Sequence, residues 1–191
     1  MIDLRPSSDQ VPERGSVLLS EPFIEDPFFK RTVVLLCEHN EEGSFGFVLN
    51  NYIDIELDQI VDEFPHLPYS ISVGGPVKNT NLFYIHTLGD LIPESVMVME
   101  GLYFGGDFEV LKAKLIAGEV EWSAVRFFIG YSGWSANQLE EEMKEKSWFV
   151  TKVNKKTLMS TEDKDLWKSI MKKLGPRGKL IANLPVDPEL N

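Results

Sequence analysis

One serine lies in a pattern that could support nucleophilic catalysis. Ser132 sits in the pentapeptide Gly130-Tyr-Ser-Gly-Trp134, between a predicted strand at 124–129 and a predicted helix. A hydrolase nucleophile elbow occupies such a junction with the pattern G-x-S-x-G, and its catalytic histidine follows the serine. Here the fifth residue is tryptophan and all three histidines precede the serine, although another triad order on another fold stays open. We therefore interpret the pentapeptide as a structural turn in which Gly133 supplies an unusual backbone angle and Trp134 packs.

A second candidate is the pair formed by Cys37 and His39. The two residues are two apart in a predicted strand, so we expect their side chains to share a face, as a thiol and its base would require. The apolar run 32–37 that contains the cysteine is typical of a strand buried on both faces. A thiol in such surroundings has a raised pKa and is inert. We therefore predict that Cys37 is a small buried hydrophobic residue.

Metal and cofactor chemistry find little support in the residue spacing. Glu38 and His39 are adjacent in a strand and face opposite sides, so they cannot chelate one ion together. The three histidines match no metal-ligand spacing. The glycine pairs at 74–75 and 105–106 match neither a dinucleotide-binding nor a P-loop pattern, and we interpret them as tight turns. We expect no metal and no cofactor.

Polar residues near strand ends form the remaining candidates. Arg31 either pairs with Asp26 to fix the loop at a strand entrance or recognises an anion. Asn50 lies at a predicted strand end, where we favour a turn-forming role over a ligand-binding role. The complete candidate functional face consists of Arg31, Glu38, His39, Asn50, His86, Arg126, Tyr131, Ser132 and Trp134. A ligand cleft would require four of these, His39, His86, Arg126 and Tyr131, to converge.

The elements that must position these residues are strands and helices without a regular βαβ rhythm. Alternating or continuous apolar runs predict strands at 15–20, 32–37, 45–49, 71–73, 82–86, 96–99 and 124–129. Capping residues and apolar stripes predict helices that begin after residues 54, 107, 135 and 161, the last of them ending at Gly175-Pro176. We therefore predict an α+β fold, and the length of 191 residues indicates one domain covering residues 1–191.

Composition indicates a globular protein of the cytoplasm. The chain is 43% hydrophobic and 26% charged, and no apolar run reaches the roughly 18 residues that span a bilayer. The N-terminus lacks a basic region followed by an apolar one, so we expect no export. A single cysteine excludes an intramolecular disulfide. We expect a cytoplasmic location and no membrane partner.

Charge is unevenly distributed along the chain, which has a net charge of −11. Residues 1–150 carry 10 basic and 25 acidic side chains, whereas residues 151–179 carry 9 basic and 3 acidic ones. An acidic body repels nucleic acid, but the basic segment could attract it. Lys168, Lys172 and Lys173 are the residues that would bind, although periodic lysines on an amphipathic helix are more often a solvated face.

Several motifs, in this order along the chain, resemble the AlgH/YqgE family of bacterial proteins. The matching residues are Gly15-Ser-Val-Leu-Leu-Ser20, Pro22, Asp26-Pro27, Phe29, Arg31-Thr-Val-Val34, Glu38-His39, Gly43, Gly46-Phe-Val-Leu-Asn50, Gly74-Gly-Pro-Val77, Arg126-Phe-Phe-Ile-Gly-Tyr-Ser-Gly-Trp134 and Gln138-Leu-Glu140. The resemblance covers about residues 15–150, and the segment at 101–107 with the C-terminal tail is similar to the Bacteroidetes branch. The C-terminal helix and tail, 151–191, lie outside it.

The resemblance implies a single domain with a small closed or bifurcated mixed sheet surrounded by helices. Family members carry the label of transcriptional regulators, after a link to alginate synthesis, and no catalytic residue or cofactor can be carried over. We therefore predict a non-enzymatic binding or regulatory protein that acts through an unidentified protein partner. The alternatives are an enzyme or small-ligand binder using the cleft near His39, His86 and Arg126, and nucleic-acid binding through residues 151–179.

Overall fold

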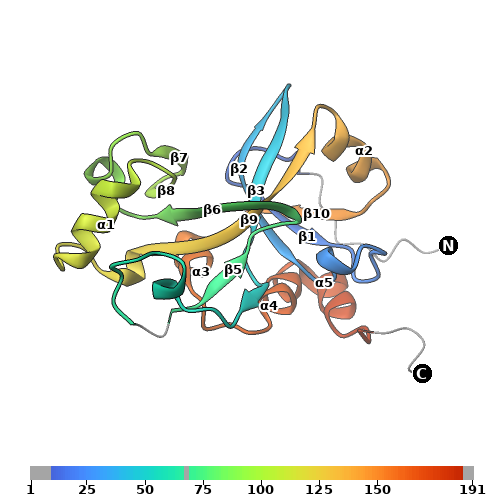
Figure 1. The fold of residues 1–191 in the computed structure, drawn as a ribbon. Coiled ribbons are helices and arrows are strands. Elements are labelled where there is room, and N and C mark those ends of the chain that lie inside the picture. Colours follow the sequence, from blue (N-terminus) through green and yellow to red (C-terminus); the bar gives the residue numbers. More distant parts are fainter. Residues whose placement is uncertain (1–9, 67–68, 187–191) are drawn as a thin grey trace.

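The computed structural model describes residues 10–66 and 69–186 and contains one ten-stranded sheet with helices on both sides (Figure 1). The strands are β1 (Val17–Ser20), β2 (Val33–Asn40), β3 (Gly43–Val48), β4 (Tyr52–Ile53), β5 (Ile71–Val73), β6 (Val77–His86), β7 (Val96–Met99), β8 (Leu102–Phe104), β9 (Val125–Ser135) and β10 (Trp148–Thr151). The α-helices are α1 (Phe108–Ile116), α2 (Gln138–Lys144), α3 (Lys155–Met159), α4 (Leu166–Lys173) and α5 (Gly175–Ala182). Short 3₁₀ turns are η1 (Pro27–Phe29), η2 (Leu57–Gln59), η3 (Gly89–Leu91) and η4 (Trp122–Ala124).

The long strand β9 is the branch point of the sheet. Along one side it pairs with β6. Along the other side its first half pairs in parallel with β5 and its second half pairs antiparallel with β3. The main path runs β10-β1-β2-β3-β9-β6-β8-β7 and does not close. The predicted α+β fold with a mixed, bifurcated sheet is therefore confirmed, and the closed alternative is not found.

Strand alternation gives the sheet two buried faces. Leu19 and Leu35 lie in the core cluster that α4 and α5 cover, whereas Leu18 and Val34 lie in the cluster on the opposite face, against α2. A third cluster packs α1 against the other half of the sheet. The apolar stripe of α4, which includes Trp167 and Ile170, explains why this helix lies on the sheet.

One prediction about a chain break is wrong, and a second is confirmed. The pentapeptide 130–134 is part of β9 and not a turn, because it forms the ladder to β3. Gly130 has a φ of 70°, and a side chain there would crowd the Val77 carbonyl, so glycine permits a bend within the strand. Gly175-Pro176 ends α4 as predicted, but Pro176 then sits in the first turn of a further helix, α5.

Short elements account for the other differences. The stretch after residue 54 forms only the 3₁₀ turn η2, which begins after Glu56. The strands β8 and β10 and the helix α3, with three, four and five residues, were not predicted. The helix after Asp107 is confirmed as α1, with the aspartate side chain accepting a hydrogen bond from Val110 N at 3.1 Å.

Candidate functional site

Ser132 is a buried structural residue of β9. Its hydroxyl donates a hydrogen bond to the Gly74 carbonyl oxygen at 3.0 Å and thereby links β9 to the segment after β5. No histidine is among its hydrogen-bond partners in the described part of the chain. The geometry of a serine nucleophile with its base is therefore not formed here.

Cys37 and His39 point to opposite faces, so the prediction of a shared face is wrong. A β-bulge between Leu36 and Glu38 inserts Cys37 as an extra residue and reverses the alternation. Cys37 is fully buried in the same core cluster as Leu35, and burial raises the pKa of its thiol. Its predicted role as a small buried hydrophobic residue is confirmed.

His39 faces α2, together with Trp134. Its Nδ1 lies 2.7 Å from the Ser44 hydroxyl, and its Nε2 lies 3.8 Å from a Glu140 carboxylate oxygen. The Trp134 indole N–H donates to Glu142 at 2.9 Å, and the same carboxylate oxygen accepts from Trp148 at 2.7 Å. One carboxylate of α2 thus fixes two tryptophans of the sheet.

Arg126 is the largest fully buried side chain and forms a polar node inside the protein. Its guanidinium donates to the carbonyl oxygens of Leu49 and Leu158, the latter at 2.7 Å. Weaker contacts reach the Tyr52 hydroxyl at 3.3 Å and the Ser72 hydroxyl at 3.4 Å. No carboxylate is among its partners in residues 10–66 and 69–186, and burial lowers the pKa of the guanidinium. Arg126 joins the ends of β3, β4, β5 and α3.

Arg31 binds the C-terminal segment. Its Nη2 donates to the carbonyl oxygens of Leu184 and Pro185 at 2.6 and 2.8 Å, and the guanidinium lies 5.0 Å from the centroid of the Trp167 ring. Asp26, its expected partner, instead caps η1 by accepting a hydrogen bond from Phe28 N. The residue therefore holds the segment after α5 against α4.

Asn50 and His86 also make internal contacts. Asn50 accepts a hydrogen bond from Val33 N and donates one to the Arg31 carbonyl oxygen, both at 2.9 Å, and so extends the pairing of β2 with β3. The fully buried His86 has its Nε2 3.0 Å from the Gly105 carbonyl oxygen, and its Nδ1 accepts from Leu88 N. Burial lowers the pKa of this imidazole, which favours the neutral form.

The four residues of the predicted cleft do not converge. His39 faces α2, His86 binds the loop after β8, and Arg126 lies under α3. Tyr131 instead packs among aromatic rings on the face opposite α2. No common cavity among the described residues is lined by all four.

Tyr131 belongs to a partly exposed surface that we call the aromatic patch. The patch is formed by Phe45 of β3, Phe83 of β6, Phe104 of β8 and Tyr131 of β9. Phe45 contacts the other three rings, with centroid distances of 5.2 Å to Tyr131, 5.5 Å to Phe104 and 6.4 Å to Phe83. Only the tyrosine was among the predicted site residues. The alternation of Phe45 and Phe47 indicates that both side chains lie on one face of their strand. The spacing of residues in the sequence does not predict that rings from different strands come together.

Two exposed valines extend the aromatic patch. Val77 is the cross-strand partner of Tyr131 and Val96 is that of Phe104, and each valine is 37% exposed. Directly opposed residues of paired strands share a face, so both valines lie on the patch side. Contiguous exposed apolar surface rimmed by polar residues is typical of interaction sites.

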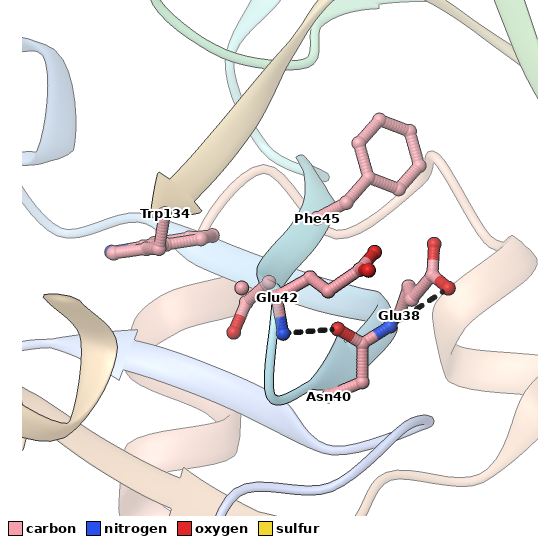
Figure 2. A pocket seen from close by; sticks show the side chains of 7 residues that line it. Glu38, Asn40, Glu42, Phe45 and Trp134 are labelled. Atoms are coloured by element: carbon pink, nitrogen blue, oxygen red, sulfur yellow. Dashed lines mark hydrogen bonds between the residues drawn. The ribbon is translucent and has the colours of Figure 1, made fainter. Parts of the chain in front are cut away.

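A groove at the tip of the β2–β3 hairpin adjoins this surface through Phe45. It has a volume of about 200 Å³ and is lined by Glu38, Asn40, Glu42, Gly43, Ser44, Phe45 and Trp134. Figure 2 shows the carboxylates of Glu38 and Glu42 on the same side of the hairpin as the Phe45 ring. Asn40 orders the tip, since its side chain donates to Glu38 at 3.1 Å and accepts from Glu42 N at 2.8 Å.

One cluster in the described residues has the donors to hold a metal ion. Glu56, Asp58 and His66 bring their ligand atoms within 4.8 Å of one another near η2. His66 is 76% exposed, and its Nδ1 already contacts Glu56 at 2.7 Å and Asp58 at 3.3 Å. The three side chains are thus already in contact with one another, and only His66 is exposed.

The three lysines of the basic segment project from α4. Lys172 and Lys173 are exposed and Lys168 is half-buried, while the opposite side of the helix is buried.

Among the described residues, no helix combines the length and the apolar character that crossing a bilayer requires.

Comparison with known proteins identifies close relatives over most of the chain. A protein of Parabacteroides distasonis is 42% identical and one of Bacteroides thetaiotaomicron 40% identical, both named "UPF0301 protein"; the matches cover 96% and 97% of this chain and 94% of each relative. The solution structure of the AlgH protein from Pseudomonas aeruginosa is similar with a TM-score of 0.73 and 26% identity, covering 90% of this chain and 94% of that one.

A crystal structure of a Corynebacterium diphtheriae protein, 21% identical with a TM-score of 0.75, shares the fold and covers 92% of this chain and 94% of that one. The family model described as "AlgH-like" matches residues 17–179, which extends the resemblance through α3, α4 and most of α5. The chain belongs to the AlgH-like family.

Proposed function

We propose that this protein is a non-enzymatic regulatory protein of the cytoplasm that acts by binding a protein partner through the aromatic patch. The observation that carries the proposal is the group of four partly exposed rings from four strands, with two exposed valines beside them. Aromatic residues in well-packed clusters supply most of the binding energy at protein interfaces.

The buried positions of three other candidate residues support a binding role. Ser132, His86 and Arg126 are fully buried and make internal hydrogen bonds, although the Arg126 Nε has no partner among the described residues. Catalytic groups must reach a substrate, so buried groups with internal partners are structural. The aromatic patch, by contrast, keeps its rings partly exposed.

The experiment that tests this proposal is affinity purification from the source cells with tagged wild-type protein and two variants. Phe83→Ala removes a ring from the patch, and Ile116→Ala is the control, because Ile116 is 49% exposed at the end of α1. We expect a set of proteins that wild type and the control retain and that Phe83→Ala loses. Thermal melts confirm that each variant is folded. Identical retention by a folded Phe83→Ala protein would overturn the proposal.

A further inference from the structure

We propose that the hairpin groove of Figure 2 receives a single lysine or arginine side chain of the bound partner, next to the aromatic patch. This inference rests on the proposed function and specifies the chemistry of the partner. It follows from the size of the groove, from its charge and from its continuity with the patch.

Size excludes larger ligands. The groove holds about 200 Å³, whereas pockets for cofactors and drug-sized molecules have volumes of roughly 300–1,000 Å³. A space of this size, open to solvent at a hairpin tip, suits one long side chain.

Charge selects a cation. Glu38 and Phe45 are direct cross-strand partners and therefore project from the same face of the hairpin. Glu42 follows in the turn and is exposed. A cation placed over the ring would be attracted by its π face and by both carboxylates together.

The charges already near the groove leave room for this cation. Arg14 approaches Glu38 at 4.0 Å, the outer limit of an ion pair, and its Nη1 reaches the Met97 carbonyl oxygen at 3.5 Å. The Glu42 carboxylate has no ion pair among the described residues. One acidic group is thus unneutralised beside the ring.

Continuity with the aromatic patch explains why the cation would come from a protein. Phe45 lines the groove and also contacts Phe83, Phe104 and Tyr131. A partner segment with apolar residues on the patch would therefore place an adjacent basic residue in the groove. Apolar anchors with a charged neighbour at the rim are a common arrangement of interfaces.

The test is an NMR titration of the full-length, isotope-labelled protein with each of two capped tripeptides. Binding is monitored by the backbone amide chemical shifts of residues 38–45. The probes are acetyl-Leu-Arg-Leu-amide and acetyl-Leu-norleucine-Leu-amide, which differ in the central charge. We expect at least tenfold tighter binding of the arginine peptide, and a decrease in its affinity as salt is added. The double variant Glu38→Gln, Glu42→Gln should reduce this preference to less than twofold. The control Glu141→Gln, whose carboxylate pairs with Lys144 on α2, should retain it.

Two outcomes would overturn the inference. Equal binding of the two peptides at the patch would show that the groove does not select a cation, while leaving the patch as a docking surface. Absence of shifts at residues 38–45 with the arginine peptide would show that the groove takes no such side chain. In both cases the purification with Phe83→Ala still decides the proposed function separately.

Discussion

The node around Arg126 and the aromatic patch differ in which kind of side chain is buried and which is exposed. At the node, a strongly polar group is fully buried and donates to carbonyl oxygens of separate segments. At the patch, apolar rings remain partly exposed on the sheet. Residue type alone would predict a functional role for the arginine and a structural role in the core for the rings. The contacts favour the reverse assignment, and the following predictions test it.

The largest expected effect is on stability, at the node. Arg126→Ala should lower the free energy of unfolding by about 3–5 kcal/mol, because it leaves a large cavity and buried carbonyl oxygens without donors. Urea denaturation measures this change. Arg126→Lys is the informative comparison, since one ammonium can restore only part of the contacts. A loss below about 1 kcal/mol for the alanine variant would contradict the structural role.

The next effect is expected where Glu142 joins the two tryptophans. Glu142→Ala should cost about 1–3 kcal/mol, because two indole N–H groups lose their common acceptor. Glu142→Gln should cost less, since an amide oxygen can still accept. The matched control is Glu141→Ala, which removes an exposed ion pair with Lys144 and should change stability by no more than about 1 kcal/mol. Equal losses at both positions would argue against the bridge.

A smaller effect concerns pH. Burial lowers the pKa of His86 in the folded state, so the unfolded chain binds more protons as pH falls through the ordinary value near 6.5. The imidazole contribution to stability is therefore complete above this value and decreases below it. Melting temperatures between pH 7.5 and 5 should fall less steeply for His86→Gln than for wild type. Equal slopes for the two proteins would contradict a contribution of His86 to the pH dependence.

At the patch, a substitution should change binding with little change in stability. Val77→Ser and Val96→Ser alter side chains that are each 37% exposed, and stability should shift by about 0.5 kcal/mol or less. Both variants should lose the partner proteins retained by wild type in affinity purification. Retention of these proteins by either variant would show that the docking surface is smaller than the aromatic patch with its two valines.

The smallest effect is expected at the basic segment. Lys168→Glu, Lys172→Glu and Lys173→Glu together should leave binding to duplex DNA at 50 mM salt unchanged, because we expect none from the wild-type protein. A gel-shift titration measures this. Salt-sensitive binding by wild type that the triple variant loses would instead establish these lysines as a nucleic-acid surface.

The sequence was most informative where one pattern had one structural meaning. The run up to Cys37 is typical of a buried strand and Asp107 of a helix N-cap, and both predictions are confirmed. The bulge at Cys37 was not predictable, since it depends on the pairing of β2 with β3. The patch was missed for the same reason. Its four rings come from four strands, and only the strand order places them together.

The branching of the sheet at β9 has a consequence for synthesis of the protein on the ribosome. The strands β3, β5 and β6 all precede β9, and each pairs with it. A nascent chain that ends before residue 125 therefore has three strands without their common neighbour, and their edges stay open until β9 emerges. Such unpaired edges are sites of aggregation for incomplete chains. Premature termination before β9 should accordingly produce insoluble fragments rather than a smaller folded unit.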